Sequence, residues 1–220
     1  MTASKFLFLF FISFGVFAFE FKKGEGSEFV MTSQGQKVNL NIYVVAVADH
    51  QMSVEMHFGT GGLLGMNMYQ QFQMGLKGSS PIQVQKGYVL TPSSNAPEVM
   101  KDYLFHQNRG VQMNDFLFNK KEDIEGAFVG DETIEVPAGS LIAKHYRKSN
   151  NGQVVDFWIS DVVKPIGLVK LVSTSSKEKF NNYSIELSSL LKNVAPKIDP
   201  NKAIPMTKAT EEMLKSDHSN

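Results

Sequence analysis

Alternation of apolar and polar residues is the dominant pattern of the chain, and it is clearest in two neighbouring segments, 51–58 and 66–76. Successive side chains of a β-strand point to opposite faces, so this period of two predicts strands that bury one face. A glycine-rich stretch at 59–62 separates the segments. We therefore expect two amphipathic strands joined by a loop. The apolar positions are Met52, Val54, Met56 and Phe58 in the first strand, and Met66, Met68, Phe72, Met74 and Leu76 in the second.

Further strands are predicted along the rest of the chain, together with a single helix. Asn95, Pro97 and Glu98 resemble a capping box with proline in the first turn, which predicts a short helix over 96–106. Asn151-Gly152 favours the positive φ angles of a tight hairpin. The additional strands are expected at 38–47, 133–136, 141–147, 154–160, 168–172 and 180–187.

This pattern indicates a mainly β (α+β) fold in one domain, residues 19–195. We expect a curved antiparallel sheet, or incomplete β-barrel, with one or a few short helices covering its concave face. Such a sheet leaves a face that its own side chains do not fill, so something must cover it. Prolines and a polar end over 196–220 predict a mobile C-terminal tail.

The first residues have the features of a targeting segment. Lys5 precedes an uncharged run from Phe6 to Phe19, and small residues at Val16 and Ala18 fit a cleavage site. This predicts a signal peptide over 1–18, cleaved near Ala18. The absence of Cys means that no oxidative folding is needed, which fits a soluble protein of a bacterial periplasm.

Composition excludes several classes of function. The 220 residues include 22 Lys and Arg against 22 Asp and Glu, so no basic surface for nucleic acid is expected. The lack of Cys excludes thiol nucleophiles and Cys-ligated metals. The glycine cluster 59–65 lacks the Lys-Ser/Thr pair of a phosphate-binding loop. We therefore expect no cofactor and no metal.

Catalytic machinery is not indicated by spacing. The five His form no metal-binding pair on a helix, and the acidic residues fit solvated strand faces. We expect the protein not to be an enzyme. A hydrolase stays open as an alternative, and it requires that at least two of a small set converge in space: His57, His106, His145, Asp131 and Asp156.

Methionine is the most informative residue type. Most of the 11 Met lie between residues 31 and 113, and several share one apolar face with Phe58 and Phe72. Because methionine is unbranched and polarisable, a Met-rich surface can repack around varied guests. An ordinary core that uses Met is the alternative. The predicted lining of a hydrophobic ligand site is Met52, Val54, Met56, Phe58, Met66, Met68, Phe72, Met74 and Trp158.

The segment 131–190 carries a recognisable set of motifs. A Val136-Pro137-Ala138-Gly139 turn leads to a tryptophan-containing strand at 155–160 and a Pro165-Ile166-Gly167 break. These resemble exported bacterial proteins that are similar to the periplasmic lipoprotein-carrier (LolA-like) superfamily. The resemblance implies an incomplete antiparallel barrel with short helices over its concave apolar face, in which carriers receive the acyl chains of lipoproteins.

Two functions follow as expectations. The first is a periplasmic, non-enzymatic carrier or binding protein for a hydrophobic moiety: a lipid, an acyl chain or a lipidated protein. The second is a protein–protein interaction module of the cell envelope with a dry, packed core. An apolar face that accepts a ligand would indicate the first function, and a face that forms a dry, packed core would indicate the second.

Overall fold

The computed structural model describes residues 21–48, 51–60, 67–75, 83–106, 127–150, 152–177 and 182–216. The expected signal peptide and Met66 lie outside the described residues. The strands are β1 Gly26–Ser33, β2 Gln36–Ala48, β3 Gln51–Thr60, β4 Asn67–Gly75, β5 Gln83–Leu90, β6 Glu98–Val99, β7 Phe128–Val136, β8 Gly139–Asn150, β9 Gln153–Ile159, β10 Leu168–Ser175, β11 Tyr183–Leu191 and β12 Ile204–Pro205. The helices are α1 Asp102–His106, the 3-10 turn η3 Pro200–Lys202 and α4 Lys208–Ser216.

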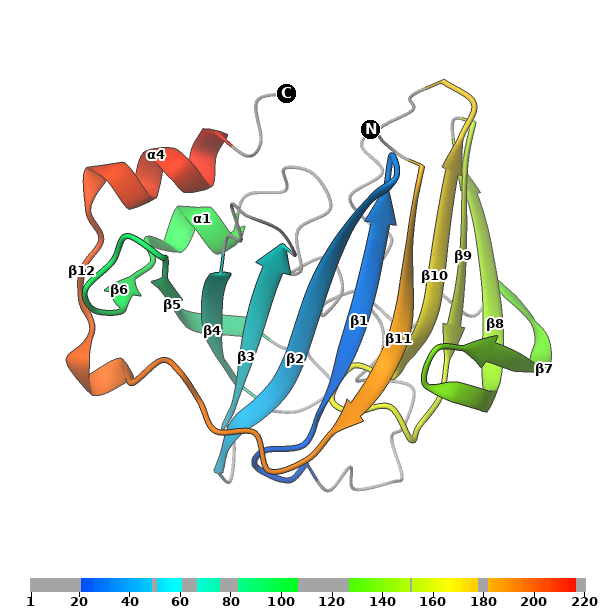
Figure 1. Ribbon diagram of the computed structural model, residues 1–220, viewed down its shortest axis with the longest axis horizontal. Coiled ribbons are helices and arrows are strands. Elements are labelled where there is room, and N and C mark those ends of the chain that lie inside the picture. Colours follow the sequence, from blue (N-terminus) through cyan, green and yellow to red (C-terminus); the bar gives the residue numbers. More distant parts are fainter. Residues whose placement is uncertain are drawn as a thin grey trace.

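All twelve of these strands form one sheet, in the order β12-β6-β5-β4-β3-β2-β1-β11-β10-β9-β8-β7. The N-terminal arm, β1 to β6, runs outward from the centre in sequence order, and the C-terminal arm, β7 to β11, returns from the other edge. Antiparallel pairing of β1 with β11 joins the arms. The sheet is curved and not closed into a barrel (Figure 1), which confirms the predicted fold class.

One face of this sheet is apolar across both arms. In the N-terminal arm Met52 pairs with Met74, and Val54 pairs with Phe72. Cross-strand partners lie on the same face, so the pairs can be followed from strand to strand. Through β2 and β1 the apolar face reaches Leu187. The residues that continue it are Leu40, Phe29, Ile185, Leu171 and Phe157.

These side chains form one hydrophobic cluster drawn from both arms. Alternation explains its composition, because every second residue of β3, β4 and β9 faces it. β1 and β2 approach so closely that Gly26 is required. A Cβ there would lie 2.3 Å from the Ile42 carbonyl oxygen. Helix α4 adds Leu214 to the cluster, and Leu104 of α1 packs against it.

The predicted helix over 96–106 is mostly wrong. Only Asp102–His106 is helical, while Glu98 and Val99 form the short strand β6. Here Glu98 does not close a capping box; its carboxylate accepts a hydrogen bond from the Ser94 hydroxyl and another from the Thr207 N–H. Tertiary pairing with the C-terminal segment therefore overrides the local capping signal.

Residues 194–216, which we call the strap, differ from the expected mobile tail. Figure 1 shows the chain leaving β11, crossing the sheet and reaching the edge beside β6 and α1. There β12 pairs with β6 in parallel, and the Ile204 N–H donates to the Pro97 carbonyl at 2.8 Å. The 3-10 turn η3 precedes β12 and the helix α4 follows it, so a proline-rich sequence here produces a docked segment.

Candidate functional site

The structure brings most of the predicted lining residues together. Met52, Val54, Met56, Phe72 and Met74 occupy adjacent positions of β3 and β4, with exposed fractions between 0% and 3%. Phe58 and Met68, which pair with each other at one end of these strands, are half-buried and pack against the cluster. The described part of this set is therefore a packed apolar surface.

Thioether side chains dominate the centre of this surface. Met52 and Met74 lie opposite each other across the β3–β4 ladder, and Met56 lies opposite Gln70. The Gln70 amide points toward the Met68 sulfur, with a nitrogen-to-sulfur distance of 3.9 Å. A layer built from unbranched methionines changes shape at lower cost than one built from branched residues.

Trp158 is half-buried and packs against the hydrophobic cluster, but it lies apart from the methionines of β3 and β4. On β9, Val155, Phe157 and Ile159 are buried on the apolar face, so Trp158 points to the opposite, polar face. There its indole stacks on the His145 ring, with centroids 4.4 Å apart, and donates a hydrogen bond of 2.6 Å to Glu132. It thus belongs to a polar cluster of the C-terminal arm.

That polar cluster centres on His145, which lies between two carboxylates from neighbouring strands. The Nε2 atom is 2.6 Å from Asp156 of β9, and Nδ1 is 2.8 Å from Glu132 of β7. Arg147 donates to both oxygens of Asp156, at 2.7 and 3.2 Å. Hydrogen bonding to Asp156 raises the pKa of the Arg147 guanidinium above its ordinary value.

A hydrolase requires at least two residues of the predicted set to converge, and among the residues that the structure describes only one pair of them is in contact. His145 and Asp156 do converge, but His57 stacks on Tyr69 in the N-terminal arm, with ring centroids 4.4 Å apart. Asp131 is exposed and pairs in register with Lys144. The His106 side chain lies outside the described residues. Both ring nitrogens of His145 already contact carboxylates, which leaves neither nitrogen directed at a substrate.

Metal binding by this cluster is not supported. Within the described ranges, no three His, Asp or Glu side chains are arranged to hold a metal ion. The imidazole lies between its two acidic neighbours, whereas ligands of one ion converge on a shared point. The geometry instead ties β7, β8 and β9 together by side-chain hydrogen bonds.

A second polar centre is Glu55 in the N-terminal arm, which does not lie on the solvated strand face expected for the acidic residues. Its side chain is fully buried and faces away from the methionines of β3. It accepts hydrogen bonds from the Tyr43 hydroxyl at 2.5 Å and the Gln71 amide at 3.1 Å. The main-chain N–H groups of Lys197 and Ile198, in the strap, donate to it at 2.8 and 3.0 Å.

Glu55 therefore holds the strap by its backbone. Gln71 completes the contact by donating to the Ile198 carbonyl at 3.2 Å. Burial, together with the hydrogen bond to Glu55, raises the pKa of Tyr43 far above its ordinary value, so the phenol stays a donor. No spacing rule would reveal this carboxylate, because Glu55 occupies an ordinary polar position of an alternating strand.

Glu98 also binds the strap, near the edge of the sheet. This buried carboxylate accepts hydrogen bonds from the Thr207 N–H at 2.7 Å, the Thr210 hydroxyl at 2.9 Å and the Ser94 hydroxyl at 2.9 Å. Burial by itself raises its pKa, but the hydrogen bonds from Thr207, Thr210 and Ser94 outweigh burial and lower the pKa of Glu98. The strap is thus anchored at two buried carboxylates.

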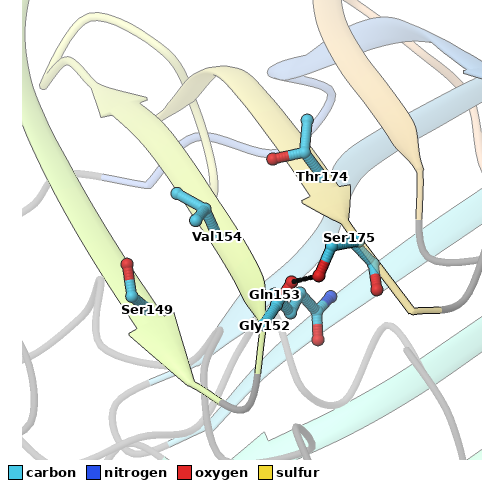
Figure 2. A pocket seen from close by; sticks show the side chains of 7 residues that line it. Ser149, Gly152, Gln153, Val154, Thr174 and Ser175 are labelled. Atoms are coloured by element: carbon cyan, nitrogen blue, oxygen red, sulfur yellow. Dashed lines mark hydrogen bonds between the residues drawn. The ribbon is translucent and has the colours of Figure 1, made fainter.

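A shallow pocket lies apart from these centres, beside the β8–β9 turn and the end of β10 (Figure 2). Its volume is about 570 Å³. Five of the seven lining residues carry a hydroxyl or amide side chain, and Ser176 donates to the Gly152 carbonyl at 3.3 Å. The lining residues are Ser149, Gly152, Gln153, Val154, Thr174, Ser175 and Ser176. This lining differs in chemistry from the predicted apolar site.

Comparison with known proteins gives structural likeness only. No protein-family model matches the chain, and no curated protein matches it in sequence. A structure from Bacteroides fragilis, of a protein assigned as exported with a YmcC-like fold, shares 13% identity over 77% of this chain and 98% of its own, with a TM-score of 0.38.

A hypothetical protein of Chlamydia trachomatis shares 10% identity over 86% of this chain and 95% of its own, with a TM-score of 0.45. The resemblance to lipoprotein carriers is not confirmed by these comparisons and stays a prediction. Among the described residues, no helix has the length and apolar character needed to cross a membrane.

Proposed function

We propose that the protein is a non-enzymatic binding protein of the bacterial cell envelope that holds an apolar moiety, such as an acyl chain, against its methionine-rich sheet face. The supporting observation is one continuous apolar face in a sheet that is not closed into a barrel. The envelope location rests on the signal-peptide features of residues 1–18.

Binding would require the face to repack. Because Met52, Met56 and Met74 are buried, a guest has to displace side chains. Flexible thioethers allow such displacement with little strain. Each buried methylene of the guest contributes about 0.8 kcal/mol, so an acyl chain of about ten methylenes gains roughly 8 kcal/mol before the entropic cost of binding is subtracted.

Native mass spectrometry of protein isolated from an envelope fraction tests this function. We expect a copurified or added acyl chain, with dodecanoate as the probe, to remain bound to the folded chain. Replacing Met52, Met56 and Met74 together by Leu keeps the face apolar but branched, and should weaken dodecanoate binding. The matched control replaces Val162 and Ile204, which are 56% and 43% exposed, by Leu. Protein that is always ligand-free, in both forms, would contradict the proposal.

A second candidate, the envelope interaction module, is favoured by the C-terminal arm. Phe128, Val129 and Ile142 are 49%, 57% and 75% exposed at the β7 edge of the sheet. The packed state of the predicted lining also fits a dry core. Phe128 and Val129 begin β7 and Ile142 pairs with Thr133 further along it, so the exposed apolar residues are spread along one edge that a partner could cover. A partner that binds equally to wild-type protein and to the triple Leu variant would support this role.

A further inference from the structure

The two edges of the sheet differ in what they offer to another chain. The edge at β12 is two residues long and contains Pro205, which has no N–H to donate. The edge at β7 spans nine residues and, among the described strands, pairs with β8 alone. A long edge strand presents backbone donors and acceptors to an added strand.

The β7 edge is accessible to solvent. Apart from Gly130, Ile134 and Val136, every residue of β7 is exposed. Thr133 of β7 pairs with Ile142 of β8. Among the described residues, Ile142 is the most exposed large hydrophobic residue. Solvent access therefore coincides with an edge that no other described strand pairs with.

Charge selects among the possible occupants. Asp131, Thr133 and Glu135 alternate along β7 and so lie on one face. If a second copy paired antiparallel with β7 so that the two Thr133 residues were opposite each other, Asp131 of each copy would lie directly opposite Glu135 of the other. Like charges in directly opposed positions are destabilising. Self-association through β7 is therefore disfavoured, while a strand with cations at those two positions is complementary.

We propose that β7 is a docking edge for an extended segment of a partner protein that carries Lys or Arg at two positions four residues apart, with an apolar residue midway. In antiparallel register the cations face Asp131 and Glu135, and the apolar residue faces Thr133 next to Ile142. This inference rests on the interaction role given above as the second candidate function.

The test uses the full-length chain, labelled with ¹⁵N, and two capped peptides, Thr-Arg-Thr-Val-Thr-Arg-Thr and Thr-Glu-Thr-Val-Thr-Glu-Thr. We expect the arginine peptide to shift the backbone amide signals of residues 128–136 and to bind about tenfold more tightly than the glutamate peptide. The D131K/E135K variant should reverse this preference. A matched control, D161K/E212K, changes two exposed acids elsewhere and should leave it unaltered.

Equal binding of both peptides, amide shifts confined to other strands, or an unchanged preference in D131K/E135K would overturn the inference. The interaction role itself is tested separately. If an envelope partner binds the D131K/E135K variant as well as wild type, the docking edge is wrong while the interaction role stands. If no envelope partner binds either form although the peptides behave as expected, the interaction role fails and the edge specificity stands.

Discussion

The two arms of the sheet bind their carboxylates in different ways. In the N-terminal arm, Glu55 and Glu98 are buried beneath the strap, and main-chain N–H groups are among their donors. In the C-terminal arm, Glu132 and Asp156 are bound by His145, Arg147 and Trp158, and Glu132 remains largely exposed.

The difference shows what each cluster can do. A main-chain N–H neither titrates nor moves independently of the fold, so Glu55 and Glu98 fix the position of the strap. If the buried carboxylate loses such donors, or the donors lose the carboxylate, water cannot replace the lost hydrogen bonds. In the C-terminal cluster His145 is buried, but Arg147 and Glu132 are 57% and 46% exposed, so water can replace their contacts and the contribution of the cluster to stability should be smaller.

The largest effect is expected at Glu55. The change E55A removes the acceptor of four hydrogen bonds and leaves the Lys197 and Ile198 N–H groups buried without it. We expect a loss of roughly 3 to 5 kcal/mol in the free energy of unfolding. Urea denaturation measures it. The matched control is E135A on the exposed edge of β7, where a change below about 0.5 kcal/mol is expected.

Glu98 should give the second largest effect. The E98A change leaves the Thr207 N–H and the Thr210 hydroxyl without their acceptor at the start of α4. A loss of about 2 kcal/mol is expected, accompanied by faster hydrogen exchange in 204–216 than in β3. Uniform acceleration over the whole chain would show instead that the strap is not a separate unit.

A smaller effect is expected for D156N in the C-terminal arm. The amide keeps the shape of the side chain but removes the charge that binds Arg147 and His145. The expected cost is about 1 kcal/mol. Trp158 is the single tryptophan of the chain and stacks on His145, so its fluorescence reports the local change. A cost equal to that of E55A would abolish the distinction between the arms.

The smallest effect concerns pH and helix α4. Hydrogen bonds from Lys101, Lys215 and Tyr103 lower the pKa of Glu211 from 4.5 to about 2. The ionised form is favoured in the folded chain, so this contribution is complete above pH 4.5 and disappears as the pH falls toward 2. We expect the protection factors of the α4 amides, which are corrected for the intrinsic pH dependence of exchange, to fall over that window. In E211Q this pH dependence should be absent.

Alternation was enough to predict the strands β3 and β4 and the grouping of Met52, Val54, Met56, Phe72 and Met74. The prediction of Trp158 in the apolar lining was wrong, because parity along β9 places it opposite the buried residues Val155, Phe157 and Ile159. Curvature and the open sheet followed from many such strands with few helices to cover them.

Pairings between distant segments were not predictable. Glu55 meets Lys197 across 142 positions of sequence, and nothing in either neighbourhood signals the contact. The same long-range pairing converts the apparent helix start at Asn95 into strand β6, and gives order to a segment whose prolines suggested mobility. The contacts of Glu132 and Arg147 were not predicted, because they depend on the register of β7, β8 and β9.

The most direct test of the central claim is a titration of protein labelled with ¹³C in the methionine methyl groups, using dodecanoate and NMR. The proposal predicts saturable shifts of the Met52, Met56 and Met74 signals, while Trp158 fluorescence on the polar face stays constant. If those three methyl signals do not move at any dodecanoate concentration, the apolar face is a closed core and the binding function is contradicted.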